Sequence, residues 1–170
     1  MLSRVVLLGA ALFTFAACDE NSANAGTGIY DKASGSIKAS VNGTTVNATK
    51  NVHGILTGND AANSAVRRLL IQAENSDGTV IYLHVESAFG PGTYPLGGSP
   101  ATPSYGAVSQ GGTTHLWISN ALGGTGSVTI DEISDSHAKG SFTFVAVPQP
   151  GSPVTGSMTV TSGTFDISPN

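Results

Sequence analysis

The amino-acid sequence predicts an all-β domain, an antiparallel β-sandwich or flattened barrel of about 9–10 strands. Apolar and polar residues alternate in runs rich in β-branched and aromatic side chains, which is typical of half-buried strands. Turn pairs such as Asn42-Gly43 and Asp77-Gly78 separate these runs, and links this short join only antiparallel neighbours. Charged residues make up 11% of the chain and hydrophobic residues 39%, which disfavours both long amphipathic helices and disorder.

The first residues, 1–17, are expected to be a lipoprotein signal peptide. Arg4 precedes an uncharged apolar run from Val5 to Phe15, and small residues follow that run. As a helix the run would be about 16 Å long, too short to span a bilayer core of ~30 Å. We therefore expect an exported chain whose leader is removed.

The stretch Phe15-Ala16-Ala17-Cys18 resembles the lipobox of bacterial lipoproteins. The resemblance implies that the Cys18 thiol carries two acyl chains such as palmitate and that cleavage occurs before Cys18. The alternative is an ordinary cleaved signal peptide with a chance or buried cysteine, but Cys18 is the only cysteine in the chain. Each CH₂ group of an acyl chain that enters the bilayer contributes ~0.8 kcal/mol to membrane binding, so several acyl chains anchor a protein stably. The expected location is the cell envelope, on the periplasmic side or at the cell surface, with Cys18 in the membrane.

Residues 18–35 are expected to form a lipidated flexible tether, and residues 36–170 a single all-β domain. The tether is rich in Asn, Ser, Ala and Gly and has few apolar side chains to offset the entropy of ordering. A flexible chain of this length has a typical end-to-end distance of ~20 Å. One domain is the natural count for 170 residues.

Within the domain, about ten runs are expected to be strands, and a short helix is expected only at 60–68. The longest irregular stretch runs from Gly97 to Gly112, and long loops often carry function. The expected strands span 36–41, 44–48, 52–56, 68–74, 79–86, 113–119, 127–133, 140–147, 156–161 and 163–168.

Several segments of the domain are similar to one known family. The chain resembles a family of uncharacterised bacterial lipoproteins that carry an all-β domain of unknown function. The resemblance covers nearly all of the mature chain and implies the fold and the envelope address, but no activity, cofactor or catalytic residue. The segments that carry it are Val41-Asn42-Gly43-Thr44, Gly92–Gly97, Gly126–Ile133, Lys139–Phe144 and Ser162–Ile167.

Charge and motifs narrow the functional classes. A formal charge of -4, with seven basic residues scattered along the chain, excludes the usual electrostatic surface for nucleic acid. No nucleophile elbow, phosphate-binding loop or zinc-protease motif occurs, so we expect no cofactor and lean against an enzyme without excluding one. Asp131, Glu132 and Asp135 could hold a hard cation, but a solvated acidic turn is the commoner outcome.

The candidate ligand-binding residues follow from strand parity. Tyr82, His84 and Glu86 share one face of their strand, and His115 and Trp117 share one face of theirs. If these faces meet, two histidines and a carboxylate beside two aromatic rings would suit a metal ion or a small ligand. If they do not, Tyr82, His84 and Glu86 simply face solvent.

Three functional hypotheses remain. The leading one is a lipid-anchored, non-enzymatic envelope module that binds another envelope component, a protein or a glycan, or has a structural role. The second is an envelope metal-binding protein or enzyme that uses His84, Glu86 and His115. The third is a carbohydrate-binding module in which Trp117, Tyr105 and Tyr94 stack on sugar rings; a buried Trp117 would exclude that arrangement. For His53 and His137 the sequence suggests no partner.

Overall fold

The computed structural model describes residues 32–57, 68–97, 104–112, 114–120 and 123–169. Within these ranges the chain forms eleven strands, all antiparallel, and no helix, which confirms the predicted fold class. Residues 1–17, residues 18–31 of the expected tether and residues 60–67 of the expected helix lie outside the described residues. The described part of the chain has no helix with the length and apolar character needed to cross a lipid bilayer.

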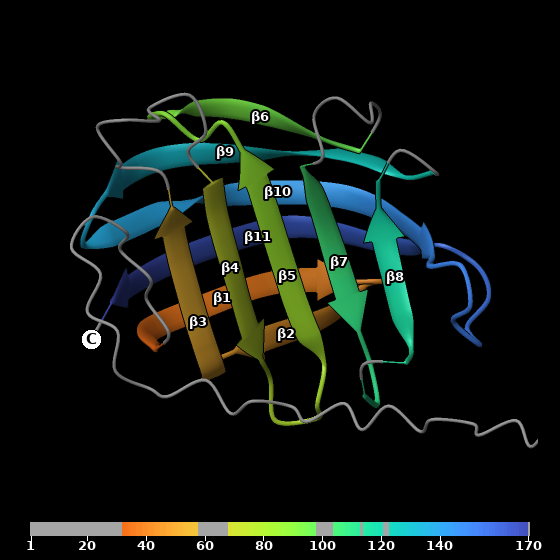
Figure 1. Cartoon of the computed structure of the whole chain (residues 1–170). Coiled ribbons are helices and arrows are strands. Elements are labelled where there is room, and N and C mark those ends of the chain that lie inside the picture. The colour runs from red at the N-terminus through yellow and green to blue at the C-terminus, as the bar shows by residue number, and fades with distance from the viewer. Residues whose placement is uncertain (1–31, 58–67, 98–103, 113, 121–122, 170) are drawn as a thin grey trace, which may run out of the picture.

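The strands form two layers that cross in Figure 1. We call the layer nearer the viewer the front sheet and the other layer the back sheet. The front sheet contains, in order, β3 (Lys50–Thr57), β4 (Arg68–Glu74), β5 (Val80–Glu86), β7 (Tyr105–Ser109) and β8 (Leu116–Ser119). The back sheet contains, in order, β2 (Thr44–Ala48), β1 (Ala33–Val41), β11 (Met158–Pro169), β10 (His137–Pro148), β9 (Thr125–Ser134) and β6 (Gly92–Gly97).

The long strand β10 joins the two layers. Over most of its length β10 pairs with β9 and β11 in the back sheet. At its end Val147 and Pro148 pair with Ile118 and Trp117 of β8, so the hydrogen-bonded path continues into the front sheet. A strand that switches sheets in this way makes the corner of a crossed sandwich. β1 begins at Ala33, slightly before the expected domain boundary at residue 36.

The sequence prediction missed two of the observed strands, β6 and β7. β6 contains Pro95 and lies at the edge of the back sheet, where a residue without an N–H is tolerated. β7 lies inside the stretch from Gly97 to Gly112 that was expected to be irregular, and it pairs with both β5 and β8. β7 was missed because most of its residues are small. Packing explains why one of these residues is glycine. A Cβ atom at Gly106 would lie 2.6 Å from Cδ1 of Phe144, so only glycine lets β7 cross that ring.

β11 replaces two expected strands, 156–161 and 163–168, with one continuous strand. A β-bulge at Ser162, whose φ is 51°, marks the position where the two runs met. The register with both neighbouring strands shifts there. The sequence pattern at this local irregularity therefore indicated a strand boundary that the fold does not have.

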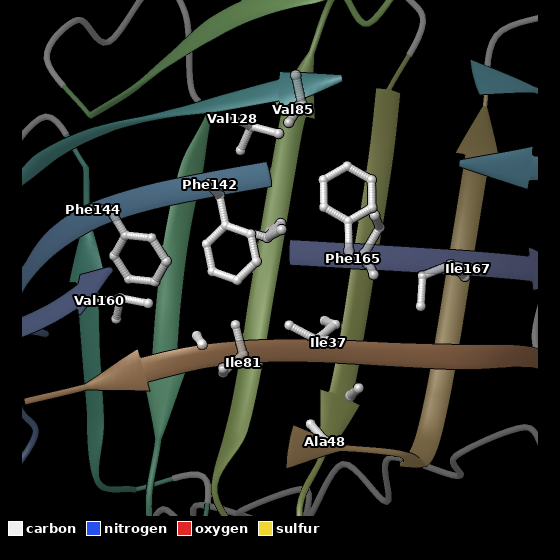
Figure 2. Packing of buried hydrophobic residues seen from close by; sticks show 14 of the residues in the cluster. Ile37, Ala48, Ile81, Val85, Val128, Phe142, Phe144, Val160, Phe165 and Ile167 are labelled. Carbon is white, nitrogen blue, oxygen red and sulfur yellow. The ribbon is translucent and has the colours of Figure 1, made fainter. Parts of the chain in front are cut away.

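The core lies between the sheets and consists of alternate residues from both. On β10 the inward residues are Ala138, Gly140, Phe142, Phe144 and Ala146, and the residues between them are exposed. Figure 2 shows the rings of Phe142, Phe144 and Phe165 between the strands of the two layers. Phe142 and Phe144 stack with ring centroids 6.0 Å apart. This inner packing leaves each sheet with an outward face that the core does not use.

Candidate functional site

The outward face of the front sheet is half-buried although no layer of described residues covers it. On β4 and β5 every second residue belongs to the core, and the residues between them are mostly of intermediate exposure. They shield one another because bulky apolar and aromatic side chains stand side by side. The main outward side chains are His53, Leu70, Gln72, Val80, Tyr82, His84, Tyr105, Ala107, Leu116 and Ile118.

Cross-strand register brings together residues that are distant in sequence. Gln72 on β4 pairs with His53 on β3 and with Tyr82 on β5. Two residues further along β5, on the same face, His84 pairs with Tyr105 on β7. Residues opposite one another on one face have Cβ atoms ~4.5–5.5 Å apart, so these side chains form one cluster. The outward parity of Tyr82, His84 and Glu86 agrees with the sequence, but their neighbours are not the expected ones.

His84 occupies an unusual environment in this cluster. Its ring packs edge-on against Tyr105, with centroids 4.9 Å apart and an interplanar angle of 80°. Its side chain is 15% exposed, and Nδ1 and Nε2 are both buried with no hydrogen-bond partner among the described residues. Nε2 lies 3.2 Å from Oε1 of Glu86, a contact that does not meet the geometry of a hydrogen bond. Buried polar groups without a partner are uncommon because each costs about 1–3 kcal/mol.

His84, Tyr82 and Tyr105 are uncharged at neutral pH. Burial lowers the pKa of His84, and the nearby carboxylate of Glu86 opposes that effect only in part. The imidazole therefore has one N–H donor and one nitrogen acceptor. Burial raises the pKa of Tyr82, with Glu74 and Tyr105 adding to the rise, and burial likewise raises the pKa of Tyr105. Both phenols keep their protons.

Charged groups lie at the two ends of the cluster. At one end Nε of Arg68 lies 2.7 Å from Oε1 and 2.9 Å from Oε2 of Glu86. At the other end Nδ2 of Asn51 donates a hydrogen bond of 2.6 Å to Oε2 of Glu74, and Lys50 is the cross-strand partner of Glu74. The pair formed by the half-exposed Arg68 contributes little stability. Its effect on the site is to balance the charge of Glu86.

Two adjoining hollows lie over the cluster, and we call them together the front groove. The first, of about 110 Å³, is lined chiefly by His53, Leu70, Gln72, Tyr82, His84 and Tyr105. The second, of about 530 Å³ and open to solvent, extends past Val80 and Ser109 to Gly111. Because both are lined by His53, Gln72 and Tyr82, they form one continuous depression. The smaller hollow combines neutral hydrogen-bonding groups with apolar side chains, and Glu74 also lines the larger hollow.

The structure does not bring Trp117 to this site. Trp117 points into the core, is 9% exposed, and donates a hydrogen bond of 3.2 Å from Nε1 to the carbonyl of Gly156. Tyr94 also packs against the core, and its hydroxyl donates to the carbonyl of Gly90 at 2.6 Å. Sugar stacking on Trp117 is therefore excluded, and of the three rings in that hypothesis only Tyr105 lines the groove.

His115 is also remote from His84. The backbone N–H of Gln110 donates to the carbonyl of His115 at the turn between β7 and β8. His84 pairs with Tyr105, which lies five positions along the chain from Gln110, a separation of ~17 Å in an extended strand. The expected site with two histidines and Glu86 is not formed, because β7 lies between β5 and β8. No group of three or more His, Cys, Asp or Glu side chains in the described residues could hold a metal ion.

A second histidine cluster, which the sequence did not suggest, lies on the back sheet. Nε2 of His137 lies 2.8 Å from Oδ1 of Asp166, and its Nδ1 lies 3.3 Å from Oε1 of Glu132. The hydrogen bond to Asp166 and the carboxylate of Glu132 raise the pKa of His137. We call these three residues the His137 clasp. It connects β9, β10 and β11, so Glu132 of the expected acidic turn faces an imidazole.

Part of the front groove could have been found in the sequence. The alternation of Arg68–Glu74 already places Leu70 and Gln72 on one face of a strand. The contributions of His53 and Tyr105 could not be found, because strand neighbours are not encoded by periodicity and β7 was not recognised.

Comparison with known proteins yields a family match over most of the chain. Residues 33–167 match the family described as a domain of unknown function, DUF6252. No curated protein and no solved structure matches the chain. The match begins at the first residue of β1 and ends within β11, so it takes in both sheets and the front groove. The chain therefore belongs to the DUF6252 family.

Proposed function

We propose that this protein is a lipid-anchored module of the bacterial cell envelope that binds another envelope component in its front groove. Cys18 would carry the acyl chains, and residues 18–31 would link them to the domain. The support for the anchor is the leader and the lipobox-like stretch that ends at Cys18. The support for the binding role comes from the domain.

The observation that carries the binding role is the state of His84. Its two ring nitrogens are buried without a hydrogen-bond partner among the described residues, and its side chain lines a hollow of about 110 Å³. A bound molecule that supplies an acceptor and a donor would remove this cost. Largely preformed hollows with apolar walls and a few convergent polar groups are the usual form of ligand sites.

The chemistry of the groove favours binding over catalysis. Its imidazole contacts the carboxylate of Glu86 at 3.2 Å without the geometry of a hydrogen bond, and that carboxylate is paired with Arg68. The hydroxyl of Ser109, which lines the larger hollow, donates to the carbonyl of Gly112 at 2.7 Å and not to a base. Covalent catalysis needs a nucleophile within hydrogen-bonding reach of a base.

Mass spectrometry and fractionation test the anchor. We expect the mature protein from its native cells to begin at Cys18 with acyl chains on the thiol, and to partition into the detergent phase. Cys18→Ser should move the protein to the soluble fraction, whereas the control Ser22→Ala should not. An unmodified thiol in the wild-type protein would disprove the anchor.

Tyrosine labelling in cells tests the binding role even while the ligand is unidentified. Tyr82 and Tyr105 should react more slowly with a phenol-modifying reagent in intact cells than in the purified full-length protein. Tyr94, whose hydroxyl is bonded to Gly90, is the matched control and should react equally in both. Equal reaction of all three residues in cells and after purification would contradict an occupied groove.

A further inference from the structure

We infer that the front groove binds a neutral oligosaccharide, with its hydroxyl groups on His84 and the flat faces of its rings against Tyr82 and Tyr105. This inference rests on the proposed binding function and adds the chemical class of the ligand. The charge of the groove, its apolar side chains, its unused hydrogen-bonding groups and its shape each support it.

Charge disfavours the ionic alternatives. Among the described residues, the cations beside the groove are Arg68, which is paired with Glu86, and Lys50, which lies opposite Glu74 in the sheet register. The two cations and the two carboxylates balance in number, so no net positive charge remains for a phosphate or a uronic acid. No net negative charge remains for a polyamine either. Such a surface suits a molecule without net charge.

Hydrogen-bonding capacity identifies the polar groups of the ligand. A neutral imidazole needs an acceptor for its N–H and a donor for its other nitrogen. A hydroxyl group supplies either role, whereas a carboxylate only accepts and an ammonium only donates. The side chains of Gln72, Tyr82 and Tyr105 add further donors and acceptors around the same hollow. Adjacent hydroxyl groups on a ligand match this arrangement.

The apolar part of the groove suits the C–H face of a sugar ring. Leu70 and the rings of Tyr82 and Tyr105 line the smaller hollow. Aromatic side chains with a polar tip make flat contact surfaces at low entropic cost. A sugar has the same division, with an apolar face and hydroxyl groups at its edge.

The topology disfavours an extended peptide as the occupant. Peptides commonly bind a sheet by adding a strand to an open edge, where free backbone groups are available. The front groove lies over the faces of β3, β4, β5 and β7. The backbone groups of β4, β5 and β7 are used on both sides by neighbouring strands, and the open edge of β3 lies at the margin of the groove. Over β4, β5 and β7 only side chains face the ligand.

The shape of the groove suits a chain of sugar rings. From the level of His84 to the level of Val80 the groove follows β5 for ~14 Å. The smaller hollow would hold one ring near His84, and the larger one would hold the continuation of the chain past Ser109. Binding should therefore strengthen with the length of the oligosaccharide.

Calorimetry on the full-length protein tests the inference. The protein is kept in a polyoxyethylene detergent, which has no sugar headgroup. The neutral probes are cellohexaose, xylohexaose, maltohexaose and chitohexaose, and the charged probe is hexagalacturonic acid. At least one neutral probe should bind, more tightly than its disaccharide, and His84→Phe or Tyr82→Ala should weaken that binding by ~10-fold or more.

The control variant is His137→Phe, which makes the same substitution on the outward face of the back sheet. It should bind the neutral probe as the wild type does. The ring ¹⁵N signals of His84, and not those of His137, should shift on binding. A His84→Phe variant that melts no lower than the wild type ensures that lost binding is not lost folding.

Several results would overturn the inference. These are saturation by the charged probe alone, binding that survives both groove substitutions, self-association of the protein that requires Tyr82, and failure of every neutral probe. In the last two cases protection of Tyr82 and Tyr105 in cells would still support the proposed binding function. An unmodified Cys18 would remove the anchor and leave the calorimetric result unaffected, so the two proposals fail separately.

Discussion

The outward faces of the two sheets obey the same alternation but differ in chemistry. On β10 of the back sheet the outward residues include Lys139, Ser141 and Thr143, and they are exposed. On β5 of the front sheet the outward residues include Tyr82 and His84, and they are half-buried. The core uses only the inner faces, so folding does not require aromatic rings and imidazoles outside. The back sheet therefore presents a solvated polar face, whereas the front sheet presents a half-buried face with aromatic rings.

The two outward histidine clusters make the same contrast. His84 is half-buried, its two ring nitrogens lack a hydrogen-bond partner among the described residues, and its pKa is lowered. His137 lies between Asp166 and Glu132 and has a raised pKa. One imidazole lines the front groove, and the other contacts carboxylates of the two neighbouring strands.

The largest expected effect lies on the shared inner face. Phe144→Ala should destabilise the protein by about 3–5 kcal/mol, because Phe144 is 2% exposed and fills the space beneath Gly106. Ser141→Ala, at an outward position of the same strand, should change stability by less than ~0.5 kcal/mol. Urea unfolding followed by circular dichroism measures both. Equal effects would show that the inner face of β10 is not the core.

A smaller effect is expected at the outward face of the front sheet. Leu70→Ala should cost about 1–2 kcal/mol, because part of this half-buried side chain is removed from water by its neighbours. If Leu70→Ala were as neutral as Ser141→Ala in the same urea titration, the two outward faces would not differ in packing.

His84→Phe should stabilise the protein by about 1 kcal/mol at neutral pH, because it replaces two unpartnered polar atoms with apolar ones in a site of nearly the same shape. Thermal unfolding without ligand measures this change. A lowered melting temperature would mean that the ring of His84 has a hydrogen-bond partner in the protein.

The smallest effects concern pH and have opposite signs. The pKa of His84 is lower in the folded state, so its contribution is complete above the unfolded value of ~6.5 and decreases as the pH falls below it. The pKa of His137 is raised, so its contribution is complete below ~6.5 and is lost as the pH rises through the folded value.

Unfolding free energies between about pH 5 and pH 8 separate the two histidines. In His137→Phe the contribution of His84 remains, so stability should increase more steeply with pH than in the wild type. In His84→Phe the contribution of His137 remains, so stability should increase less steeply or decrease. Titrations that are shared by both variants cancel in the comparison. Identical slopes would contradict the opposite pKa directions.

Sequence reasoning reached the fold class and only part of the site. Alternation located most strands and placed Tyr82, His84 and Glu86 outward, because side-chain direction has a strict period of two. It failed for β7, where Gly106 is required by a ring from β10 and lowers the local strand signal. It did not identify Tyr105 as the neighbour of His84, and the faces that carry His84 and Trp117 do not meet.

The sequence by itself determined that the chain is all-β and antiparallel and which residues of most strands share a face. These are local properties, set by side-chain periodicity and turn residues. Only the tertiary structure decided that β7 separates β5 from β8, that His53 and Tyr105 join His84, and that His137 meets Asp166. The physical reason is that backbone hydrogen bonds between strands are the same for every side chain. Neighbours are therefore chosen by the packing of the whole core.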